Sequence, residues 1–140
     1  MECVVDLSYS AGWFQPSQQH PAATHLLKAH LDGEVTVICP SIWIYEVINL
    51  LLNAVRRRTL SETQADDGFE LLSAIDARIE EQHTHIITRR ILRLGRQFGL
   101  SAYDAAYLEL ADRLQLPLLT RDEELLTAAK QRHLPITLNL

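Results

Sequence analysis

Short apolar runs rich in β-branched residues alternate along this chain with longer segments of helical periodicity. Runs of the first kind are typical of strands, and a weaker candidate strand lies around residues 78–80. The other predicted strands are residues 3–6, 35–39, 116–120 and 135–140. Strands that are separated by helices indicate a parallel sheet covered on both faces.

Local signals indicate where the helices begin and end. Gly33 ends the first predicted helix, and Pro40 opens an apolar helix that runs to about Arg57. Ser61 and Gln64 fit a capping box for the next helix, which runs to about residue 74. Further helices are expected over residues 84–98, 101–114 and 123–132. The predicted fold is a single α/β domain over residues 1–140, a three-layer α/β/α sandwich with a central, mainly parallel sheet.

The composition is that of a globular domain. Of the 140 residues, 47% are hydrophobic and 22% are charged, which excludes a disordered or fibrous chain. The longest apolar stretch, Ile42–Leu52, is too short to span a bilayer and contains Glu46 and Asn49. Glu2 and Asp6 interrupt the first apolar run, so no signal peptide is expected. The sequence therefore predicts no membrane association.

The cysteines and the net charge add two further expectations. Cys3 and Cys39 lie in strand-like apolar runs, and the Cys/His spacing of a zinc site is absent around them. Both are therefore expected to be core residues of a reduced, cytoplasmic protein. The net charge of −5 argues against simple non-specific binding to nucleic acid, which depends on basic surfaces. It does not exclude a nuclease, because the carboxylates of a metal site also add negative charge.

Asp6 and Glu46 are the first two candidates for chemistry. Asp6 follows the first predicted strand, and open α/β sheets bind ligands beyond the carboxyl ends of their strands, although an Asp there also suits a turn. Glu46 lies in an apolar helix, where burial of an unpaired carboxylate costs several kcal/mol, roughly. It therefore needs a metal ion or a partner, such as an arginine from elsewhere. Asn49 is one turn further on and is placed to orient Glu46.

Asp104 and Asp122 have both a structural and a functional interpretation. Ser101 and Asp104 fit a capping box, and Asp122 is a preferred N-cap before the last helix. Asp122 also follows a predicted strand, as Asp6 does. Hard divalent cations such as Mg²⁺ favour oxygen ligands from separate elements, and such a site supports hydrolysis of a phosphodiester. Taken together, the four acids suggest one metal site.

The order and spacing of these residues resemble the PIN-domain family, and more closely its VapC toxins from toxin–antitoxin pairs. The resemblance covers essentially the whole chain. Its most specific part is the block Leu100–Tyr107 together with Thr120 and Asp122 after the next strand. The other matching segments are Val4–Ser8 and Glu46 with Asn49.

This resemblance implies an RNA endonuclease that uses Mg²⁺ or Mn²⁺. It also implies a homodimer that is inhibited by a small antitoxin protein bound in the active-site groove. The positions that match the catalytic and metal-binding acids are Asp6, Glu46, Asp104 and Asp122, and those that match supporting polar residues are Ser8, Asn49 and Thr120. The alternative is a catalytically silent PIN-fold module that binds RNA or a partner protein.

Other features favour structural interpretations. The basic run Arg56–Arg58 follows a helix and is typical of a solvated C-terminus, with contact to an RNA backbone as the alternative. Trp13 and Phe14 favour packing, although an aromatic pair can also stack on a base. The only lysines, Lys28 and Lys130, do not directly follow strands, which disfavours a phosphoacceptor domain.

Overall fold

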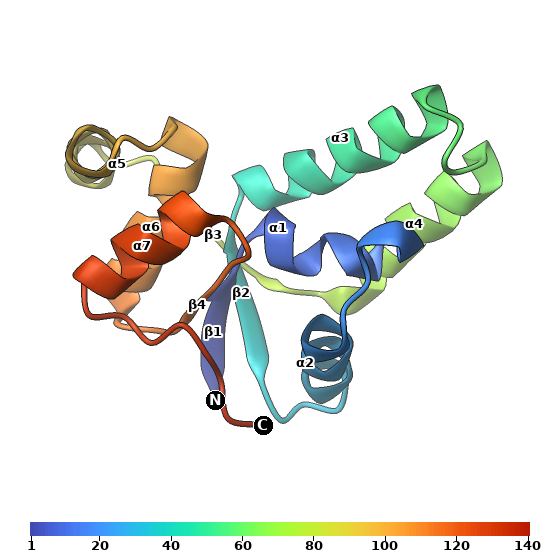
Figure 1. Ribbon diagram of the computed structural model, residues 1–140, viewed down its shortest axis with the longest axis horizontal. Coiled ribbons are helices and arrows are strands. Elements are labelled where there is room, and N and C mark those ends of the chain that lie inside the picture. Colours follow the sequence, from blue (N-terminus) through green and yellow to red (C-terminus); the bar gives the residue numbers. More distant parts are fainter.

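A parallel sheet of four strands, in the order β3-β2-β1-β4, forms the middle of the computed structural model, which describes residues 1–140 (Figure 1). Helices α5, α6 and α7 cover one face of the sheet, and α1 to α4 lie on the other side (Figure 1). This arrangement confirms the predicted three-layer α/β/α sandwich. The strands are β1 (Glu2–Val5), β2 (Thr36–Pro40), β3 (Arg78–Glu80) and β4 (Leu118–Leu119).

The helices account for most of the chain, and α3 and α4 form a pair that extends away from the sheet (Figure 1). No helix is both long and apolar enough to cross a membrane. The helices are α1 (Leu7–Ser10), α2 (Pro21–Leu31), α3 (Ile42–Arg56), α4 (Glu62–Ile75), α5 (His85–Phe98), α6 (Ala102–Leu114) and α7 (Glu123–Gln131), with 3-10 turns η1 (Ala11–Trp13) and η2 (Pro16–Gln18).

The central strands β1 and β2 are buried on both faces, as the continuous apolar runs predict. They pair in parallel, with Val4 opposite Ile38, and β4 pairs with the other edge of β1. Cys3 and Cys39 are fully buried with free thiols, which confirms their placement in the core. Because all the strands are parallel, their carboxyl ends meet at one edge of the sheet.

Two expectations about the strands were wrong. Residues 135–140 form no strand, and Leu118 N donates a hydrogen bond to Pro135 O (2.9 Å) beside β4. A proline has no N–H to give to a ladder, so the pairing does not extend from this point. Pro40 ends β2 opposite Glu80 and does not open α3, which begins at Ile42.

The segment after β1 contains helical turns that the sequence did not reveal. The Asp6 side chain caps α1 by accepting a hydrogen bond from Tyr9 N, and η1 follows at once. Trp13 and Phe14 are buried, and Trp13 Nε1 donates to Ala23 O (2.7 Å). Their predicted packing role is confirmed, and neither ring is free to stack on a base.

Two acids in the middle of α6 are buried and fully paired. The Glu109 carboxylate is inaccessible to solvent and accepts hydrogen bonds from Arg113 Nε (2.8 Å) and Gln82 Nε2. Asp112 accepts a hydrogen bond from Arg132 Nη2 (2.7 Å). These contacts tie α6 to the segment before α5 and to the end of α7, so the network holds the helical layer of α5 to α7 together.

Removal of the Glu109 carboxylate should destabilise the fold, because it leaves Arg113 partly buried without its partner. We expect Glu109→Ala to lower the free energy of unfolding by about 3–5 kcal/mol, measured by urea denaturation. The matched control is Glu70→Ala on α4, where the side chain is exposed and the change should stay within about 0.5 kcal/mol. Equal stability of the two variants would contradict the structural role of this network.

Candidate active site

Asp6 stands at the carboxyl end of β1 and is the most buried of the candidate acids, with 4% of its surface exposed. Its Oδ1 accepts hydrogen bonds from Ser8 Oγ (2.8 Å) and Tyr9 N (3.0 Å). Its Oδ2 accepts one from Thr120 Oγ1 (2.6 Å). The carboxylate is therefore held in one orientation by groups from both β1–α1 and the segment after β4.

Ser8 and Thr120 join the ends of two neighbouring strands. Their hydroxyl oxygens lie 3.1 Å apart. Arg121 N donates to Ser8 Oγ (2.8 Å), and Asp122 N donates to Thr120 Oγ1 (3.0 Å). The two hydroxyls thus fix the backbone that carries Asp122 relative to Asp6. The structure brings together all four of these predicted residues.

Glu46 projects from the first half of α3 and is half-buried. Its Oε1 accepts a hydrogen bond from the Tyr107 hydroxyl (2.7 Å), and its Oε2 has no partner within the chain. No arginine pairs with it, so that alternative was wrong. Asn49 makes no hydrogen bond to Glu46, and the expectation that it orients the carboxylate was wrong as well. Tyr107 takes that place.

Tyr107 is the site residue that sequence reasoning missed. It lies three residues after Asp104 on α6 and therefore on the same helix face. That spacing was the available signal, since the identity of its partner depends on how α6 and α3 pack. The phenol is buried, and burial together with the Glu46 charge raises its pKa far above the usual range. It remains a hydrogen-bond donor at all ordinary pH values.

Asp104 and Asp122 each lie in or beside the first turn of a helix. Ser101 caps α6 by accepting a hydrogen bond from Asp104 N (3.2 Å), and the Asp104 carboxylate makes no hydrogen bond of its own. Asp122 is the N-cap of α7, where its Oδ1 accepts from Leu125 N (2.8 Å) and its Oδ2 has no partner. Capping therefore uses only part of Asp122 and leaves Asp104 free.

One cavity of about 280 Å³ receives all four acids. Ser8 and Tyr107 also line this cavity, while Asn49 lines a neighbouring one and Thr120 lies behind Asp6. The topology thus brings together acids that are up to 116 residues apart in the sequence, from Asp6 to Asp122.

Asp6, Glu46 and Asp104 have raised pKa values. Burial raises the pKa of Asp6 and of Glu46, and the neighbouring acids raise both further. The pKa of Asp104 is raised by burial and then by the charge of Asp122. No lysine, arginine or histidine forms an ion pair with any of the four, whereas Glu109 and Asp112 are paired with arginines. The cavity therefore carries negative charge that the chain does not neutralise.

The donor set suits a hard divalent cation. All the candidate ligands are oxygens, and the unbonded ones are Glu46 Oε2, Asp122 Oδ2 and the Asp104 carboxylate. No three acidic side chains converge closely enough to hold an ion by themselves. Mg²⁺ usually takes one or two carboxylates and keeps several waters, so such convergence is not required for it. The residues present fit a hydrated cation in this cavity.

Comparison with known proteins identifies the family. The sequence matches the PIN domain over residues 4–131. It is 27% identical to Ribonuclease VapC3 of Pyrobaculum aerophilum over 125 residues, which cover 89% of this chain and 92% of that protein. The crystal structure of PAE2754 from Pyrobaculum aerophilum superimposes with a TM-score of 0.70 at 26% identity, covering 91% of this chain and 79% of the other. The chain belongs to the PIN-domain family.

Proposed function

We propose that this chain is a divalent-metal-dependent endoribonuclease and the toxin of a VapBC-type pair. The observation that carries the proposal is the cavity lined by Asp6, Glu46, Asp104 and Asp122 without a single paired cation. The similarity to a protein named Ribonuclease VapC3 supports RNA as the substrate. Mg²⁺ or Mn²⁺ is the proposed cofactor, since both favour oxygen ligands.

The side chains of the cavity have distinct proposed roles. Asp6, Glu46, Asp104 and Asp122 would hold the ion, one or two of them directly and the others through its water molecules. When bound, a divalent ion supplies positive charge to a phosphodiester that undergoes in-line attack by water. Ser8 and Thr120 keep the Asp6 carboxylate in place, and Tyr107 fixes one oxygen of Glu46 and leaves the other to accept a proton or a ligand.

The proposed partners are a small antitoxin and a second copy of the chain, in the cytoplasm. An apolar groove between α3 and α4 supports a protein partner, with Ile48, Leu52, Val55 and Phe69 among its lining residues. Leu52 and Phe69 are each about half exposed, and exposed apolar side chains that lie together are typical of interaction surfaces.

Cleavage of RNA should require both the metal and Asp104. We expect single-stranded RNA to be cleaved with Mn²⁺ and not with a chelator. Asp104→Asn should lower kcat by at least about 100-fold, measured by gel electrophoresis of a labelled RNA. The matched control is Asp67→Asn on the exposed face of α4, which should cleave at the normal rate.

An Asp104→Asn variant that cleaves RNA at the normal rate would contradict the role of Asp104. A chain that binds Mn²⁺ and cleaves no RNA under any tested condition would favour the catalytically silent module. Cleavage that is unaffected by a chelator would overturn the proposed metal dependence.

Asp104→Asn should also stabilise the metal-free chain, because it removes a charge that the neighbouring acids disfavour. The folded state raises the pKa of Asp104. The contribution of Asp104 to the stability of the normal chain therefore falls as the pH rises from the unfolded pKa through the raised folded pKa. The gain from Asp104→Asn should therefore be largest near pH 7, at under about 1 kcal/mol because solvent screens this half-exposed group. It should disappear as the pH approaches about 4, the unfolded value.

Urea denaturation in the presence of a chelator measures this gain, with Asp67→Asn as the control. Adding Mn²⁺ should reverse the order of stability, because the ion binds the folded normal chain more tightly than the variant. A variant that is less stable than the normal chain without metal would contradict the charge repulsion described for the cavity.

A further inference from the structure

A second polar cavity, of about 300 Å³, adjoins the acidic one. The two share Leu7, Gln18, Glu46 and Leu50 in their walls, so they are continuous. The second cavity contains carboxamides, a hydroxyl and a guanidinium, and Glu46 is its only acid. Along the two connected cavities, the lining therefore changes from acidic at the candidate metal site to neutral and then to basic at Arg57.

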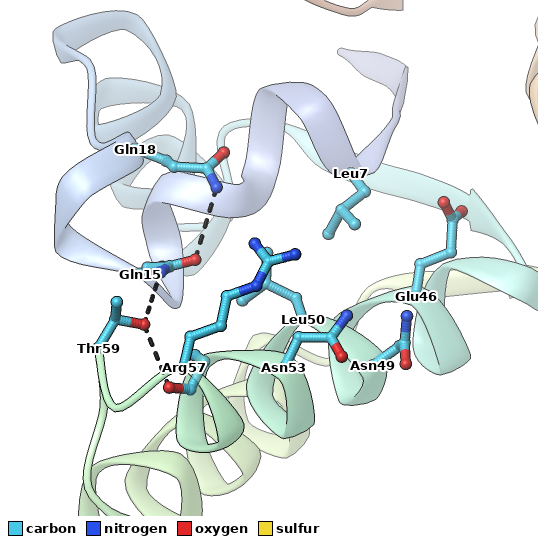
Figure 2. A pocket seen from close by; sticks show the side chains of 10 residues that line it. Leu7, Gln15, Gln18, Glu46, Asn49, Leu50, Asn53, Arg57 and Thr59 are labelled. Atoms are coloured by element: carbon cyan, nitrogen blue, oxygen red, sulfur yellow. Dashed lines mark hydrogen bonds between the residues drawn. The ribbon is translucent and has the colours of Figure 1, made fainter.

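One face of α3 forms the floor of this second cavity. Asn49, Asn53 and Arg57 follow Glu46 by 3, 7 and 11 residues, a spacing that places all four on the same side of a helix. At 1.5 Å per residue, Arg57 is about 16 Å along the helix from Glu46. Figure 2 shows this row of side chains from Glu46 to Arg57, with the Arg57 guanidinium directed back over Leu50.

Arg57 is the only cationic residue that lines either cavity. Its guanidinium forms no ion pair and no hydrogen bond, in contrast to Arg113 and Arg132, which are bound to buried acids. An unpaired guanidinium presents a planar set of donors that suits phosphate oxygens. Arg57 is therefore the one group in the two cavities that attracts an anion, and it lies beside acids that repel one.

The carboxamides of the cavity also keep unused hydrogen-bonding groups. Asn49 makes no side-chain hydrogen bond, and Asn53 uses only its oxygen, which accepts from Arg56 Nη1 (3.4 Å). An amide offers both a donor and an acceptor, the combination that recognises the edge of a base. No aromatic side chain lines this cavity, so hydrogen bonds and not stacking would recognise a nucleotide here.

The opposite wall is held in place by the N-terminal segment. Gln15 Nε2 donates to Thr59 Oγ1 (3.3 Å), and Gln18 Nε2 donates to Gln15 Oε1 (3.5 Å), as Figure 2 shows. Thr59 Oγ1 in turn donates to Ala54 O (3.2 Å) near the end of α3. These bonds connect the turns η1 and η2 to α3, so the cavity has two walls from distant parts of the sequence.

We propose that this cavity is an RNA subsite, in which Arg57 binds a backbone phosphate outside the scissile one and Asn53 reads the edge of an unpaired base. The inference rests on the proposed ribonuclease function. Single-stranded RNA fits because its base edges are accessible. Asn53 and Arg57 both follow Glu46 along α3, so the bound nucleotide lies on one side of the cleaved bond and the subsite sets sequence preference there.

The test measures the binding of a fluorescent single-stranded RNA at several salt concentrations, in an Asp104→Asn background that prevents cleavage. Each phosphate contact on a single strand contributes about −0.7 to the slope of log K against log salt. Arg57→Gln should make that slope shallower by about 0.7 and weaken binding about tenfold. Arg58→Gln is the matched control, because Arg58 is the exposed neighbour that lines neither cavity, and it should retain the original slope.

Equal effects of Arg57→Gln and Arg58→Gln on RNA binding would overturn the subsite. The proposed function would still stand in that case if the unchanged chain cleaves RNA normally. An unchanged chain that neither binds nor cleaves RNA would overturn the proposed function and the subsite with it. Thermal denaturation establishes that both variants are folded, which is expected because both side chains are exposed.

Cleavage of an RNA pool with randomised sequence tests the role of Asn53. Asn53→Ala in the otherwise unchanged chain should relax the base preference at one position beside the cleaved bond. The ratio of kcat/KM for the preferred base to kcat/KM for the other bases should fall by about tenfold. Gln97→Ala, an exposed carboxamide on α5 outside both cavities, is the control and should retain the preference. If Asn53→Ala leaves the base preference unchanged, the proposal that Asn53 recognises a base edge is overturned.

Discussion

The hydrogen bonds to the Asp6 carboxylate are the interaction on which the rest of the site depends. Burial of a charged group is unfavourable unless donors replace the water that it loses. Ser8, Thr120 and the backbone of Tyr9 supply those donors. They come from the ends of two strands that are parallel neighbours, with Val5 opposite Leu119. The hydroxyls that stabilise the buried charge therefore also position Asp122 in the wall of the cavity.

Two groups of buried or half-buried acids on α6 and its neighbours show opposite electrostatic designs. Glu109 and Asp112 are paired with arginines and stabilise the packing of the helices. Asp6, Glu46 and Asp122 accept hydrogen bonds from hydroxyl or backbone donors, and none of these three acids or Asp104 is paired with a cation. A folded chain keeps such unpaired charge only at a cost in stability. That cost is consistent with a site whose counter-charge comes from a bound ion.

Helix α3 relates the chemistry of the acidic cavity to the adjoining polar cavity. Its apolar residues Trp43, Val47 and Leu51 are buried, which fixes the rotation of the helix about its axis. That rotation directs Glu46 toward Tyr107 and leaves the row from Asn49 to Arg57 in the second cavity. The packing of one helix thus determines both where Glu46, a proposed metal ligand, lies and which polar groups line the adjoining cavity.

The sequence alone determined the fold class and most element boundaries, because apolar periodicity is a local pattern. It also predicted the four acids that the fold gathers in one cavity. It also identified Cys3 and Cys39 as core residues. Only the tertiary structure decided that Tyr107, and not Asn49 or an arginine, contacts Glu46, since that choice depends on the packing of α6 against α3. Likewise, Arg56–Arg58 form one basic run in the sequence, and only the fold shows that Arg57, and neither of its neighbours, lines the polar cavity next to the acids. Partners across long sequence separations follow from packing, which no local pattern encodes.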